Sequence, residues 1–108
     1  LRKVVRQGPI YLSVDIAALD PAHAPGVGVP WPGGMSTWEL QQILRALVGS
    51  EIVGFDVVEI CPPFDHADLT AHAGVMVLQE ILAAIADTRR SARPAPSTHD
   101  SRGGRISA

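Results

Sequence analysis

The chain has 108 residues, of which 46% are hydrophobic and 19% are charged, so it can form at most one domain with an apolar core. The formal net charge is −2, with the basic excess confined to residues 87–108, which argues against a nucleic-acid-binding surface on the folded part. A single cysteine excludes an internal disulfide framework and favours the cytoplasm. We see no signal-peptide pattern and no apolar run near the length of a membrane span, and expect no membrane association.

The first predicted element is a strand over about residues 10–16, apolar and β-branched, which we expect to be buried on both faces. A long loop rich in proline and glycine follows, and loops of this length are usually functional. A helix is predicted over 36–49, where Ser36 and Glu39 have the spacing of a capping box and Gly49 is a C-terminal stop. Its apolar stripe comprises Leu40, Ile43, Leu44 and Leu47.

A second buried strand is predicted over about 52–60 and ends before Pro62 and Pro63. A second helix is predicted over about 68–86. Its inward residues are predicted to be Leu69, Ala73, Met76, Val77, Ile81 and Ile85. Residues 87–108 lack apolar periodicity and are predicted to be a disordered Arg-, Pro-, Ser- and Gly-rich tail.

The order strand–helix–strand–helix predicts an α/β fold with parallel strands. Two strands do not form a stable sheet alone, so we expect the chain to begin inside a larger fold. In such sheets, sites gather beyond the carboxyl ends of the strands, where Asp15 and Glu59 lie. Residues 15 and 17 of a continuous strand would share a face, and an Asp-x-Asp pair there would suit Mg²⁺ or Mn²⁺, but the chain has Ala17.

The segments SVDIAALDPAHAPGVGVPWPGG and IVGFDVVEICPPFDHADLTA closely resemble the C-terminal part of the ureohydrolases (the arginase and agmatinase family). The similarity extends over about residues 8–86 and is greatest to agmatinase and guanidinobutyrase. It implies that residues 1–86 are the C-terminal portion of a three-layer α/β/α domain. It also implies two manganese ions, hydrolysis of a guanidino C–N bond to release urea, and a homo-oligomer when the protein is intact.

The resemblance further implies that Asp15 is a bridging metal ligand and that Glu59 lies near the guanidinium of the substrate. Ala17 stands where the family has a second aspartate ligand. Val27 and Val29 replace hydroxyl residues of the family loop. His66 is in a segment similar to a family loop near the active site and is a candidate for the pocket mouth. The family's other metal-binding segments do not occur in this sequence.

Structural alternatives remain for these residues. Asp15 could cap a turn, Glu59 could be a solvated strand end, and Asp20 in Leu-Asp-Pro is predicted to make an Asx turn. Asp56 is expected to be structural, and Cys61 to be a small buried apolar side chain. The three histidines near the predicted loops are expected at the surface, without metal-site spacing: His23, His66 and His72.

Three functional hypotheses follow. The first is part of a manganese-dependent amidinohydrolase acting on a guanidino compound such as agmatine or guanidinobutyrate, inactive as this chain alone. The second is a non-catalytic pseudoenzyme or a subunit that docks on a partner, favoured by Ala17, Val27 and Val29. The third is a partial reading frame without a selected role. The Gly26–Trp31 loop does not fit a nucleotide-binding motif.

Overall fold

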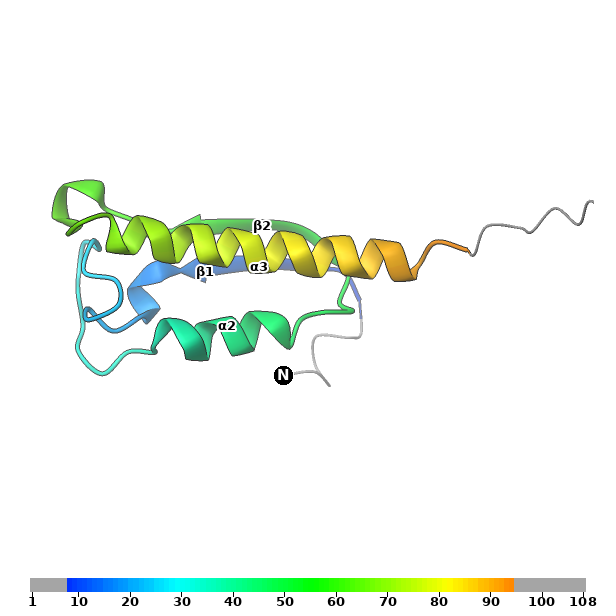
Figure 1. Ribbon diagram of the computed structural model, residues 1–108, viewed down its shortest axis with the longest axis horizontal. Coiled ribbons are helices and arrows are strands. Elements are labelled where there is room, and N and C mark those ends of the chain that lie inside the picture. The colour runs from blue at the N-terminus through cyan, green and yellow to red at the C-terminus, as the bar shows by residue number, and fades with distance from the viewer. Residues whose placement is uncertain (1–7, 95–108) are drawn as a thin grey trace, which may run out of the picture.

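The computed structural model describes residues 8–94. Its elements follow one another as predicted: strand β1 (Ile10–Asp15), helix α2 (Thr37–Arg45), strand β2 (Ile52–Val58) and helix α3 (Leu69–Ser91). The described residues form two layers, a two-stranded sheet and a pair of helices packed against it (Figure 1). The expected α/β class with parallel strands is therefore confirmed.

Strands β1 and β2 pair in parallel, with Ser13 opposite Asp56 and Asp15 opposite Val58. Val14 is buried in the core, whereas Tyr11 on the other face is 64% exposed. The prediction that this strand is buried on both faces is thus wrong for the described residues, because both helices belong to one core on one side of the sheet. The open face is polar: Asp56 accepts hydrogen bonds from the Tyr11 hydroxyl at 2.8 Å and the Ser13 hydroxyl at 2.6 Å.

Helix α2 begins with the capping box that the sequence predicts. The Ser36 hydroxyl accepts a hydrogen bond from the Glu39 N–H, and the Glu39 carboxylate accepts one from the Ser36 N–H. The hydrogen bond from the Ser36 backbone N–H, followed by that from its hydroxyl, lowers the pKa of Glu39. Leu40 and Leu44 are buried, but Ile43 of the predicted stripe is 41% exposed.

Helix α3 is longer than predicted and continues to Ser91. Its last turns are tied to the loop before β2, because the Gly49 N–H donates to the Thr88 hydroxyl at 3.1 Å. Residues 87–91 of the predicted disordered tail are therefore helical, and residues 95–108 lie outside the described part of the chain. Leu69, the first residue of α3, was predicted to face inward, but it is 45% exposed, whereas Thr70 beside it is fully buried.

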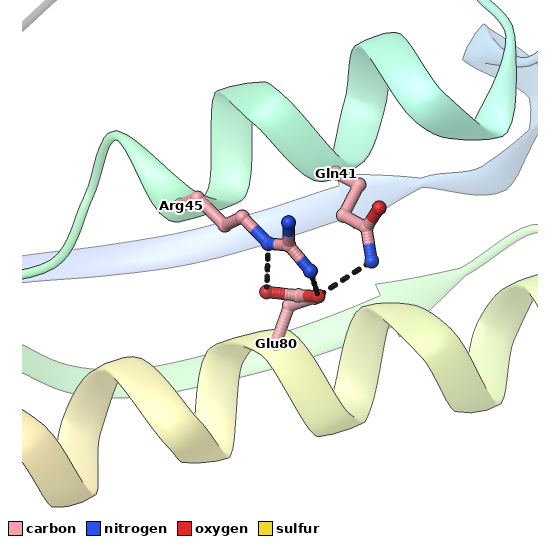
Figure 2. A network of polar contacts seen from close by, with 3 residues as sticks. All are labelled: Gln41, Arg45 and Glu80. Atoms are coloured by element: carbon pink, nitrogen blue, oxygen red, sulfur yellow. Dashed lines mark hydrogen bonds and ion pairs between the residues drawn. The ribbon is translucent and has the colours of Figure 1, made fainter.

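A polar network joins the two helices across their outer edge (Figure 2). Arg45 donates two hydrogen bonds to the Glu80 carboxylate, at 2.8 and 3.0 Å, and Gln41 donates a third at 2.6 Å. The hydrogen bond from Arg45 is the largest cause of the lowered pKa of Glu80. The apolar residues beneath the network form one core. They include Val14, Ile16, Leu19, Leu40, Leu44, Val77 and Ile81.

Helix α3 has the length and apolar composition of a membrane-spanning helix, with a mean hydropathy of 1.6 in its most apolar window. The sequence analysis predicts no apolar run of this length. Core helices of globular domains meet the same criteria, and α3 packs on both α2 and β2. Its composition is accounted for by that packing and by an additional apolar face that the described residues do not cover.

Candidate functional site

Asp15 is the last residue of β1, and its side chain is directed into a tight turn. Its Oδ1 accepts a hydrogen bond of 2.8 Å from the Ala17 N–H and caps the 3₁₀ helix η1 (Ile16–Ala18). The turn-capping alternative is therefore what the structure shows for this oxygen. The residue is exposed, so its carboxylate remains accessible at the end of the sheet.

Ala17 does not lie on a continued strand. Because β1 ends at Asp15 and η1 begins at Ile16, the alternation that would place residues 15 and 17 on one face does not apply here. The Ala17 methyl packs against the apolar core instead. It offers no oxygen to a cation.

Glu59 follows β2 and has a left-handed backbone conformation, with φ at 68°. This conformation ends the strand two residues earlier than predicted. The exposed carboxylate lies against the loop that follows β1: Oε2 is 3.9 Å from the position that a Cβ would take at Gly28. Asp15 pairs with Val58, the residue before Glu59, so the two predicted site residues lie at the same end of neighbouring parallel strands.

Asp20 organises the loop between β1 and α2, as the predicted Asx turn requires. Its Oδ1 accepts a hydrogen bond of 2.9 Å from the Ala22 N–H, and its Oδ2 accepts one of 2.8 Å from the Gly33 N–H. These two hydrogen bonds lower the pKa of Asp20. The loop buries Val27 to 2% but leaves Val29 72% exposed, so the two valines have different roles.

A cluster that the sequence reading missed joins this loop to the segment before α3. We call Gly26, Asp65 and Thr70 the Gly26 clamp. The Gly26 N–H donates to the fully buried Thr70 hydroxyl at 2.7 Å. Asp65 accepts hydrogen bonds from three backbone N–H groups that follow it, at 2.9 to 3.0 Å. The Gly26–Thr70 hydrogen bond joins residues 44 positions apart in the sequence, which no local pattern reveals.

Opposing effects act on the pKa of Asp65. Partial burial raises this pKa, but hydrogen bonds from the Thr70 backbone and hydroxyl, then from Ala71 and His66, outweigh it and lower the pKa from 3.8 to about 2. The carboxylate therefore stays charged at neutral pH. It supplies the capping group for α3, because Asp68 at the N-cap position makes no side-chain hydrogen bond there.

Within residues 8–94, the histidines and the cysteine do not form a ligand cluster. His66 is exposed, and His23 and His72 line a shallow hollow of about 320 Å³ beside the start of α3. Cys61 is half-buried rather than fully buried. No group of three or more His, Cys, Asp or Glu side chains in residues 8–94 is arranged to hold a metal ion. The described residues therefore do not by themselves fit a manganese site.

Parallel strands with acidic residues just beyond their carboxyl ends define an α/β protein of the class that places its sites at that edge. The comparison with known families specifies the class. The model of the arginase family matches residues 1–84. This chain belongs to the arginase family.

Related proteins share this segment at high identity. The chain is 47% identical over 87 residues to guanidinopropionase from Pseudomonas aeruginosa, a match covering 81% of this chain and 27% of that protein. It is 45% identical over 82 residues to agmatinase from Neisseria meningitidis serogroup C, covering 76% of this chain and 27% of the relative.

Solved structures agree in fold. Proclavaminate amidino hydrolase from Streptomyces clavuligerus matches with a TM-score of 0.78 and 41% identity, over 81% of this chain and 29% of that one. A hypothetical agmatinase from Burkholderia thailandensis matches with a TM-score of 0.81 and 38% identity, over 84% of this chain and 29% of that one. The chain thus spans under a third of the length of these relatives, and it has the corresponding part of their fold.

Proposed function

We propose that this chain forms the C-terminal part of an agmatinase-like amidinohydrolase, which hydrolyses a guanidino C–N bond and releases urea. The observation that carries the proposal is the 47% identity to guanidinopropionase over four fifths of the chain. The positions of Asp15 and Glu59 at adjacent strand ends support it. A small guanidino compound, such as agmatine or guanidinobutyrate, is the proposed substrate.

In this proposal Glu59 binds the substrate. A carboxylate accepts two parallel hydrogen bonds from the planar N–H groups of a guanidinium, and the exposed Glu59 is accessible for such a pair. Asp15 is the proposed metal ligand through the oxygen that does not cap η1. His66 is proposed at the pocket mouth, which its exposure in the segment just before α3 allows.

Manganese dependence belongs to the proposal and needs ligands beyond residues 8–94. Asp15 alone cannot fix a divalent cation, and Ala17 adds nothing to it. We therefore propose that the 108-residue chain has no amidinohydrolase activity on its own.

The test is urea release by the purified chain in the presence of Mn²⁺. Agmatine, guanidinopropionate and guanidinobutyrate are the substrates, and an active agmatinase relative is the positive control. We expect no urea above the enzyme-free background. Urea release that disappears in Glu59→Gln would contradict the proposed inactivity, although it would support the proposed role of Glu59.

A second candidate function is a non-catalytic subunit that docks on a partner. The core-packed Ala17 methyl and the apolar residues exposed on α3 favour it. The mass of the native product, measured by intact-protein mass spectrometry, separates the two. A much longer polypeptide carrying additional histidine and aspartate ligands supports the enzyme. A product near 11.4 kDa supports the docking subunit.

Three further parts of the proposal concern the intact protein. We propose a homo-oligomer, a cytoplasmic location and a role in polyamine metabolism. The location is supported by the single cysteine, and the metabolic role by the similarity to agmatinases. Contact with nucleic acid or a membrane is not part of this proposal.

A further inference from the structure

The contacts of the Gly26 clamp leave no room for a side chain at residue 26. A Cβ at this position would lie 2.6 Å from the Cβ of Asp65 and 2.8 Å from its Cα. The Gly26 N–H donates to the Thr70 hydroxyl, and the Gly26 carbonyl accepts a hydrogen bond of 2.7 Å from the Cys61 N–H. Both ends of the segment 61–70 thus hold the same glycine.

These contacts and the Glu59 side chain together connect the loop after β1 with the segment after β2. Cys61 lies two residues after Glu59, and Gly28 lies two residues after Gly26. The Glu59 carboxylate returns to Gly28, with Oε2 3.9 Å from where a Cβ would lie. The left-handed backbone of Glu59 costs free energy in a non-glycine residue and persists only where surrounding contacts fix it.

We propose that the Gly26 clamp positions Glu59 against the loop that follows β1, and that Thr70 is the positioning residue at its centre. Thr70 is fully buried, and its hydroxyl connects the Gly26 N–H with the segment that begins at Asp65. The role of this arrangement in binding a guanidinium rests on the proposed function. The claim that the Gly26 clamp positions Glu59 does not rest on the proposed function, because it concerns only contacts within this chain.

The experiment compares Thr70→Val, which removes the hydroxyl, with Thr70→Ser, which keeps it. The measurements are the nuclear Overhauser contact between the Glu59 side chain and the Gly28 α-protons, and amide hydrogen exchange at Gly26, Cys61 and Leu40. We expect wild type and Thr70→Ser to retain the contact. In Thr70→Val the contact is lost, and Gly26 and Cys61 exchange about tenfold faster or more, relative to Leu40.

A merely structural role for Thr70 gives a different result. Exchange would then accelerate equally at Leu40, and the Glu59–Gly28 contact would persist in the folded fraction. That outcome overturns the proposal. If Thr70→Val does not fold, Asp65→Asn replaces it, with Asp68→Asn as the matched control because Asp68 makes no capping side-chain hydrogen bond. Loss of the Glu59–Gly28 contact in Asp65→Asn but not in Asp68→Asn supports the clamp. Retention of this contact in both variants contradicts it.

Addition of agmatine to the same samples tests the proposed function separately. A shift of the Glu59 side-chain resonances in wild type and Thr70→Ser, but not in Thr70→Val, supports both claims. No shift in any sample, together with the expected Overhauser pattern, counts against guanidinium binding and leaves the clamp supported.

Discussion

Asp65 links the pH dependence of stability to a particular carboxylate. Its pKa of about 2 in the folded chain lies below the ordinary value of 3.8. A group with a depressed folded pKa contributes stability above its unfolded pKa, and this contribution is lost as the pH falls through the folded value. The stability that Asp65 supplies is therefore present at neutral pH and lost between about pH 4 and pH 2.

We expect Asp65→Asn to be less stable than wild type at neutral pH, because one hydrogen-bond acceptor is lost. The difference should shrink as the pH falls from 4 to 2. Chemical denaturation at a series of pH values, followed by circular dichroism, measures it. A difference that stays constant down to pH 2 would show that the Asp65 charge does not stabilise the fold.

Gly34 is a second residue with a specific consequence. An added Cβ would lie 2.6 to 2.8 Å from the backbone atoms of Asp20, Leu19 and Ala18, none of which is a flexible side chain that can yield. We expect Gly34→Ala to lower the free energy of unfolding by about 1–3 kcal/mol, as overpacking does. Gly8→Ala is the control, since nothing lies within 4 Å of its added Cβ. Equal effects in the two variants would refute the packing argument.

Some contacts of single residues could be predicted from the sequence, and others could not. The Asx turn at Asp20 was predictable because the pattern is local, and its hydrogen bonds confirm it. The hydrogen bond from the Gly26 N–H to the Thr70 hydroxyl was not predictable, because it joins residues 44 positions apart in the sequence. The roles of Asp15, Glu59 and His66 in binding metal or substrate stay predictions.

At the scale of elements, the sequence predicts correctly where α2 begins. It predicts less accurately which residues of α3 are buried. The Ser36 and Glu39 pair is sufficient to place the first turn of α2. Periodicity alone assigned Leu69 to the core, but in the first turn of α3 it is Thr70 that is fully buried, while Leu69 is 45% exposed. Ile43 of the predicted α2 stripe is likewise 41% exposed and lies outside the core cluster.

The Arg45–Glu80 pair predicts a measurable coupling between α2 and α3. Glu80 is mostly covered, with 17% of its side chain exposed, but Arg45 is 54% exposed, so solvent weakens the interaction. A double-mutant cycle with alanine should give a coupling of about 0.5–1 kcal/mol that decreases with added salt. The control cycle is Asp87–Arg90, whose side chains are 44% and 83% exposed and which should couple less. A stronger coupling in the control would contradict this assignment.

At the scale of the whole molecule, the two-stranded sheet leaves apolar surface uncovered. A groove between β2 and α3 is lined by Phe55, Val57 and Ile60, together with Val75 and Leu78, which are 47% and 40% exposed. In the longer relatives, the matched segment is under a third of the chain. The sequence predicts a larger fold around these strands, because two strands do not form a stable sheet alone.

We expect the isolated chain to self-associate through this surface at increasing concentration. Analytical ultracentrifugation measures the effect, and Leu78→Glu should reduce it because the groove then carries a charge. Gln79→Glu introduces the same charge one residue away and should have a smaller effect. A monomer at all concentrations would be evidence against an uncovered interface.

The central claim is that the described part of the chain supplies a single proposed ligand of an arginase-family metal site, Asp15, and therefore cannot hold Mn²⁺ by itself. The most direct test is the manganese content of the purified chain after equilibrium dialysis, measured by mass spectrometry of the metal in wild type and Asp15→Asn. The prediction is well under one Mn²⁺ per chain in both. One or two tightly bound Mn²⁺ ions in wild type, lost in Asp15→Asn, would contradict it.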